Sequence, residues 1–101
     1  MNISLEEIRM TNKQEAIEVV TDSGFECKIA KESADDWELL EILRKLDQNN
    51  PQLIVDAYIL LLGEEQYNKL KDHLRKDGRV KASDMIKEFF DIMKKTNELK
   101  N

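Results

Sequence analysis

The sequence predicts a mainly α-helical domain: a small bundle of about four helices over residues 34–96, preceded by a short β-hairpin over residues 16–30. Three observations support this prediction. Apolar residues recur at helical spacing after residue 33, they alternate with charged residues over 16–30, and the few glycines and the one proline separate these segments. The 101 residues are enough for one domain, so residues 1–101 are treated as a single domain.

The hairpin is predicted by alternation of apolar and charged side chains on either side of a turn. The apolar positions are Ile17, Val19, Phe25, Cys27 and Ile29. Residues 22–24 between them are Asp-Ser-Gly, a turn composition in which glycine can take a positive φ. Because an isolated hairpin is marginally stable in water, we expect it to lie on helices or on a partner.

The first two helices are predicted from caps and apolar faces. Ser33 is placed to cap the first helix, with Asp35 and Asp36 in its first turn, where the helix dipole favours acids. The second helix is predicted to start near Pro51, with Asn50 as its cap, and to end at Gly63. The apolar face of the first helix comprises Leu39, Leu40, Ile42, Leu43 and Leu46.

Two further helices are expected towards the C-terminus. The third runs from Glu64 to about Arg75 with a narrow apolar stripe, and Asp77-Gly78 ends it. The fourth begins at Ala82 or Ser83 and runs to about Thr96, which leaves residues 97–101 as a frayed polar tail. Residues 1–15 fit either a short helix or an extended arm. The apolar positions of the third and fourth helices are Tyr67, Leu70, Leu74, Met85, Ile86, Phe89, Phe90, Ile92 and Met93.

Composition excludes several classes of protein. Acidic residues outnumber basic ones 21 to 16, and a net charge of −5 repels both phosphate backbones and anionic lipid, so we expect no nucleic-acid or membrane partner. The apolar-rich run 53–62 is too short for a bilayer, which needs about 20 residues. The N-terminus lacks the pattern of a signal peptide. We therefore expect a soluble, cytoplasmic protein.

Motifs of catalysis and of metal binding are also missing from the sequence. No glycine-rich phosphate loop or nucleophile elbow occurs, and one cysteine and one histidine do not suggest a zinc site. We expect Cys27 to be a buried small hydrophobe and His73 to be a solvated surface residue. We therefore predict a protein that is not an enzyme, with no cofactor and no catalytic or metal-binding residue.

Two features indicate a surface for a protein partner. The second helix is apolar nearly all round: besides its main face it carries a second stripe of Val55, Ile59 and Leu62. Such a helix is either central in the bundle or held between the bundle and a partner. Trp37 lies at the edge of the first helix's apolar face, where it either covers the core or anchors a partner. The candidate partner-binding residues are therefore Trp37, Val55, Ile59 and Leu62.

Several segments resemble a known family. They are SGFECKIAKE at 23–32, DDWELL at 35–40, LLGEEQY at 61–67, HLR at 73–75 and DGRV at 77–80. Together they resemble the small tail assembly chaperones of long-tailed bacteriophages and of prophages of Gram-positive bacteria, over about residues 22–93. Residues 1–21 lie outside the resemblance.

The resemblance implies a non-enzymatic protein that acts in the cytoplasm of the bacterial host. It would bind the tape measure protein, keep that protein's long helices soluble and help to recruit tail tube protein, and it would be absent from the mature virion. The family offers no catalytic residue to transfer. The residues by themselves leave a second hypothesis open, a self-associating helical protein without a chaperone role.

Overall fold

The computed structural model of the chain describes residues 16–46 and 50–99. Its elements, in chain order, are β1 (Ala16–Val20), β2 (Glu26–Ala30), α2 (Lys31–Ala34), α3 (Trp37–Lys45), α4 (Leu53–Leu74) and α5 (Ala82–Leu99). The predicted fold class, a small helical bundle preceded by a β-hairpin, is confirmed. The short helix or arm predicted for residues 1–15 lies outside the described residues.

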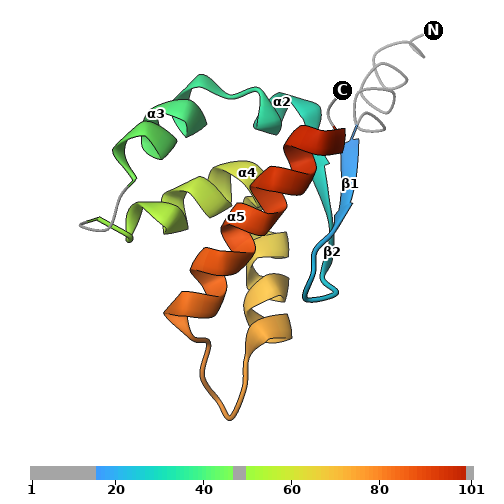
Figure 1. The fold of residues 1–101 in the computed structure, drawn as a ribbon, viewed down its shortest axis with the longest axis vertical. Helices are drawn as coiled ribbons and strands as arrows, with labels where there is room; N and C mark the ends of the chain where they lie inside the picture. The colour runs from blue at the N-terminus through green and yellow to red at the C-terminus, as the bar shows by residue number, and fades with distance from the viewer. Residues whose placement is uncertain (1–15, 47–49, 100–101) are drawn as a thin grey trace, which may run out of the picture.

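The helices and the hairpin surround one core (Figure 1). α3 packs on α4, α5 crosses α4, and the hairpin contacts α4 through β2 and α5 through β1. Every strand residue that the alternation pattern predicted to face inward is buried. The buried apolar residues are Ile17, Val19, Phe25, Cys27, Ile29, Leu39, Ile54, Ala57, Tyr58, Leu61, Leu62, Leu70, Leu74, Phe89 and Ile92.

The outer edge of β2 is closed by a side chain of α4. The Lys28 backbone N–H donates to Gln66 Oε1 at 2.7 Å, and Gln66 Nε2 donates to the Lys28 carbonyl oxygen at 2.7 Å. Gln66 therefore uses both main-chain groups that an added strand would need at this position. This capping protects the edge from pairing with another chain and ties the hairpin to α4.

The first long helix begins later than predicted. Ser33, the predicted cap, lies inside the single turn of α2, and α3 starts at Trp37 with Asp36 as its N-cap. Asp36 Oδ1 accepts the Leu39 N–H at 3.0 Å, so the carboxylate satisfies a backbone donor that the helix leaves unpaired. Asp35, with φ −112° and ψ 45°, ends α2 and separates the two helices.

α3 buries a narrower face than its periodicity predicts. Leu39 is buried and Ile42, Leu43 and Leu46 are half-buried, but Leu40 is 58% exposed. The prediction that Leu40 belongs to the core face is therefore wrong. α3 is a short helix that contacts the rest of the domain mainly through α4, so only one side of it is covered.

The second and third predicted helices join into one bent element, α4. Its backbone leaves the helical region only at Gly63, where φ is 81° and ψ is 160°, so the predicted helix end at Gly63 corresponds to the bend. The predicted start near Pro51 is corrected to Leu53, with Gln52 in the cap position. The Leu53 N–H bonds to the Asn50 carbonyl oxygen at 3.1 Å, so Pro51 lies in a tighter turn that precedes the helix.

The link to the last helix is a tight turn. Lys76 and Arg79 exchange backbone hydrogen bonds of 2.8 and 3.0 Å around Asp77 and Gly78, both of which have positive φ. This confirms the predicted break at Asp77-Gly78.

α5 begins at Ala82 as predicted and extends to Leu99, three residues past the expected end at Thr96. Residues 97–99 are therefore helical, whereas residues 100–101 lie outside the described range. Phe90, predicted to lie on the apolar face, is exposed, and the acidic Glu88 of the same helix is buried.

We predict that Gly63→Ala destabilises the fold by about 1–3 kcal/mol, because residues other than glycine are strained at this φ and ψ. An added Cβ would meet no heavy atom within 4 Å, so the cost comes from the backbone alone. Urea unfolding measures the loss, and Asn68→Ala, at an exposed site on the same helix, is the control, with an expected change within about 0.5 kcal/mol. Unchanged or increased stability of Gly63→Ala would contradict the requirement for glycine.

Candidate protein-interaction groove

The bend of α4 at Gly63 leaves an apolar groove between the two halves of the helix, and the start of α5 closes it. The groove has a volume of about 450 Å³. Its lining comes from the turn before α4, from both halves of α4, from the segment before α5 and from the first turns of α5. These residues are Pro51, Gln52, Ile54, Val55, Tyr58, Tyr67, Lys71, Val80, Ala82, Met85 and Ile86.

Tyr58 fixes the spacing of the groove's walls. Its ring lies 5.3 Å from the Tyr67 ring, across the bend, and 5.0 Å from the Phe89 ring of α5. Its hydroxyl donates to the Met85 carbonyl oxygen at 2.6 Å. Burial, and then the negative charge of Glu88, raise the pKa of Tyr58 far above its usual value, so the hydroxyl remains a donor. The groove is therefore held open by buried contacts.

Lys71 is the one charged residue among those that line the groove. Its Nζ lies 4.7 Å from the centre of the Tyr67 ring, a cation–π contact that holds the ammonium group beside the apolar wall. The groove therefore combines an apolar lining with a single positive charge at its rim. An apolar segment that carries an acidic side chain matches this chemistry.

The structure separates the four candidate partner-binding residues. Val55 is 42% exposed and lines the groove, and Ile59, one turn further along α4, is 36% exposed. Leu62, the third residue of the predicted second stripe, is 6% exposed and belongs to the core, so it is not accessible to a partner. Leu62 is one turn from Tyr58 as well as from Ile59, and packing of β2 on α4 buries that side of the helix.

Trp37 lies on α3 and is 72% exposed, so it does not cover the core and does not line the groove. The sequence allowed Trp37 either to cover the core or to anchor a partner. The exposure of Trp37 excludes the first of these roles and leaves the second as a hypothesis. The main apolar face of the predicted second helix is buried, at Ile54, Ala57, Tyr58 and Leu61, whereas Val55 and Ile59 of its second stripe are exposed, so the helix is not covered by the domain on all sides.

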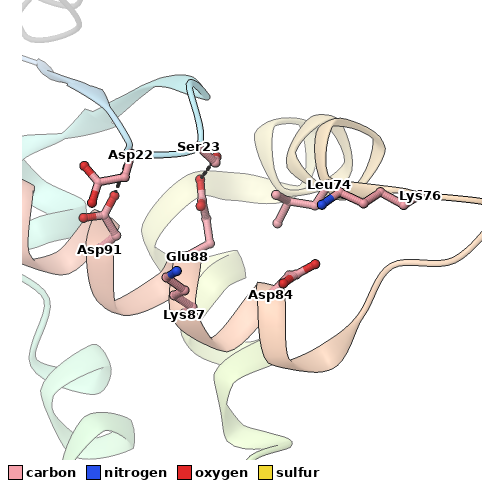
Figure 2. A pocket seen from close by; sticks show the side chains of 8 residues that line it. All are labelled: Asp22, Ser23, Leu74, Lys76, Asp84, Lys87, Glu88 and Asp91. Carbon is pink, nitrogen blue, oxygen red and sulfur yellow. Dashed lines mark hydrogen bonds between the residues drawn. The ribbon is translucent and has the colours of Figure 1, made fainter.

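A second, polar cavity of about 220 Å³ lies where the hairpin turn meets α5 (Figure 2). There Thr21 Oγ1 donates to Glu88 Oε2 at 2.6 Å, and Ser23 Oγ donates to the same oxygen at 2.9 Å. Glu88 is buried, and its two hydroxyl donors replace the water that its carboxylate loses. Thr21 Oγ1 in turn accepts the Phe25 N–H at 3.2 Å. This network attaches the turn to α5.

Asp91 strengthens the same attachment. Its Oδ2 accepts the Asp22 backbone N–H at 2.8 Å, and Lys95 Nζ donates to Asp91 Oδ1 at 2.8 Å and to Asp22 Oδ1 at 2.9 Å. Burial alone would raise the pKa of Asp91. The hydrogen bonds from Lys95 and from the Asp22 N–H, together with the charges of Lys95 and Lys94, outweigh it and lower the pKa below its usual value.

Ser23, His73 and Glu88 lie close together, but their hydrogen bonds do not activate a nucleophile. His73 Nε2 lies 3.0 Å from the Ser23 carbonyl oxygen, which can only accept, so Nε2 carries the proton. It therefore has no lone pair for Ser23 Oγ, 3.3 Å away, whose proton points to Glu88. His73 is exposed, as expected, but it also packs on the Phe25 ring at 5.5 Å and so holds the turn.

Two further kinds of reactive site that such residues could form are a metal site and a reactive cysteine thiol. Within residues 16–46 and 50–99, no group of three or more His, Cys, Asp or Glu residues is placed to hold a metal ion. Cys27 is buried as predicted, and burial, followed by the negative charge of Glu88, raises its pKa to about 11. Its thiol therefore stays protonated near neutral pH.

The sequence identified Val55 but missed the opposite wall of the groove, formed by Tyr67, Lys71, Met85 and Ile86. Gly63, between the two predicted helices, was the sequence signal for a change of direction at this point. Which residues then face each other across the groove depends on how α5 packs on α4.

No described helix is long and apolar enough to cross a membrane. No protein-family model, curated protein or solved structure matches the chain.

We predict that Asp91→Asn destabilises the fold at neutral pH but not in acid. The pKa of Asp91 is lower in the folded chain than its usual value of about 3.9, so its ionised form stabilises the fold above that pH, and the contribution is lost as the pH falls through the folded-state pKa. Urea unfolding of both proteins from neutral pH downward measures the difference. Glu26→Gln, at an exposed strand position, is the control. A difference that persists unchanged in acid would contradict the assignment.

Proposed function

We propose that this protein is a non-enzymatic tail assembly chaperone that binds a helical segment of the tape measure protein in the groove of α4 and α5. The resemblance of residues 22–93 to the tail assembly chaperones supports the choice of partner. The structural observation that carries the proposal is the groove itself, an apolar surface that is already formed and is lined in part by the exposed Val55.

The groove suits an amphipathic helix better than a small polar ligand. Its lining is almost entirely apolar, and helix-in-groove recognition places side chains spaced by one turn into such a channel. Ile59 extends the apolar surface one turn beyond Val55 along α4. A partner helix that lay along both residues would bury apolar surface that the free domain exposes to water, and this burial favours binding.

In this function the protein covers apolar helices of the tape measure protein before tail assembly and aids the recruitment of tail tube protein. It acts in the cytoplasm of the infected bacterial cell and is not retained in the mature virion. Its net charge of −5 keeps the domain itself dispersed while it holds an apolar segment.

We predict that the wild-type protein captures its cognate tape measure protein on co-expression and that Val55→Lys weakens this capture by about tenfold or more. A lysine at this position adds a charge to an apolar wall that already carries Lys71, and a tenfold change in affinity corresponds to about 1.4 kcal/mol. Pulldown followed by quantification of the bound partner measures the effect.

Val20→Lys is the matched control, because Val20 is an exposed valine on β1, outside the groove. It should capture the tape measure protein as the wild type does. Circular dichroism and urea unfolding confirm that both variants are folded. Absence of capture by the folded wild type would overturn the chaperone proposal, and equal capture by Val55→Lys would overturn the groove as the binding site.

A further inference from the structure

Lys71, at the rim of the groove, differs from its cationic neighbours on α4 because it has no carboxylate partner in the described part of the chain. Lys69 Nζ lies 3.8 Å from Glu65 Oε2, and Arg75 Nη2 lies 3.4 Å from Asp72 Oδ1. The ion pairs of residues 16–46 and 50–99 do not include Lys71. Its positive charge is therefore left for another molecule to pair.

The helix itself brings no acid to Lys71. Side chains three and four positions away share its face, and these are Tyr67, Asn68, Leu74 and Arg75. The Lys71 side chain is half-buried, and its Nζ lies 4.7 Å from the centre of the Tyr67 ring. This cation–π contact holds the ammonium group beside the apolar wall without neutralising it, because the ring is uncharged.

The chain around Lys71 is also positive. Residues 69–81 form the end of α4 and the turn that leads to α5 (Figure 1), and they carry six Lys or Arg and two Asp. The acids that adjoin lining residues in the sequence are Asp56, Asp72 and Asp84, and none of them lines the groove. Asp84 lines the separate polar cavity instead. A segment bound in the groove therefore meets an uncompensated positive charge at Lys71.

We propose that Lys71 selects the bound segment by pairing with an acidic side chain at the edge of that segment's apolar face. This inference rests on the proposed function, which places a helix of the tape measure protein in the groove. The apolar side chains of that helix would pack on Val55 and Tyr67, and its carboxylate would lie beside the Lys71 ammonium group.

The pairing would select by penalty as well as by attraction. A bound helix takes water away from Lys71, and a charge that loses water without gaining a partner is costly. A helix with a neutral residue at the matching position therefore binds more weakly, and one with a lysine or arginine there is repelled. Lys71 is thus a specificity-determining residue, and the partner is an apolar helix with an acidic edge.

Quantitative pulldown of the co-expressed tape measure protein over a range of salt concentrations tests the pairing. Lys71→Glu should weaken capture by about tenfold or more, because it places two like charges together. Lys71→Met keeps an apolar stem but removes the charge, so its capture should be weaker than that of the wild type and should depend less on salt. Lys71→Arg keeps the charge and the contact with the ring, and it should capture as the wild type does.

Lys69→Glu is the matched control. It changes the net charge by the same amount, but Lys69 is 69% exposed and does not line the groove, so capture should be unchanged. Circular dichroism and urea unfolding establish that each variant is folded. Equal losses in Lys69→Glu and Lys71→Glu would reveal a general effect of charge and would overturn the proposal. A loss in Lys71→Arg as large as in Lys71→Glu would overturn it too, because packing on Tyr67 would then explain the effect.

Charge reversal on the partner completes the test. Limited proteolysis of the complex defines the captured segment, and each of its acidic residues is then replaced by lysine. One replacement should restore capture by Lys71→Glu and weaken capture by the wild type, and restoration by none of them would contradict a direct pair. Undiminished capture by Lys71→Glu would overturn this inference alone, whereas absence of capture by the folded wild type would overturn the proposed function and this inference with it.

Discussion

Gly63 takes a φ of 81° and a ψ of 160°, a region of backbone space that other residues enter only with strain, and the direction of half of α4 depends on it. The bend places Tyr58 of the first half against Tyr67 of the second, and α5 completes the contact through Phe89 and Met85. The groove is the space that this arrangement leaves. A straight helix would separate the two tyrosines and remove the apolar channel between them.

Polar contacts attach the hairpin to the bundle at its turn and in the middle of β2. At the turn, the Glu88 carboxylate accepts hydrogen bonds from the hydroxyls of Thr21 and Ser23, and the Asp91 carboxylate accepts one from the Asp22 backbone N–H. Further along β2, Gln66 bonds both main-chain groups of Lys28. Two strands do not form a stable sheet alone, so these bonds and the apolar face beneath them hold the hairpin in place. The buried polar groups at the turn therefore hold the hairpin on α5.

The groove gives the chain an apolar surface that is formed before any partner binds. Lys71 is the one charged residue among those that line it. The proposed chaperone function uses this surface to cover an apolar helix of the tape measure protein. The net negative charge of the chain disfavours non-specific contacts between copies of the domain.

Periodicity and turn chemistry by themselves determined the fold class, the inward residues of the hairpin, the break at Asp77-Gly78 and an interruption of the helix at Gly63, because each depends on neighbours in the chain. Only the tertiary structure decided which of two competing faces was covered. It buried Leu62, exposed Leu40 and Phe90, and placed Glu88 inside, against hydroxyls more than sixty residues earlier in the chain. It also brought Lys71 to the same groove as Val55. Helical spacing defines faces but not the partner that packs on each, and that partner is set by long-range contacts that no local pattern contains.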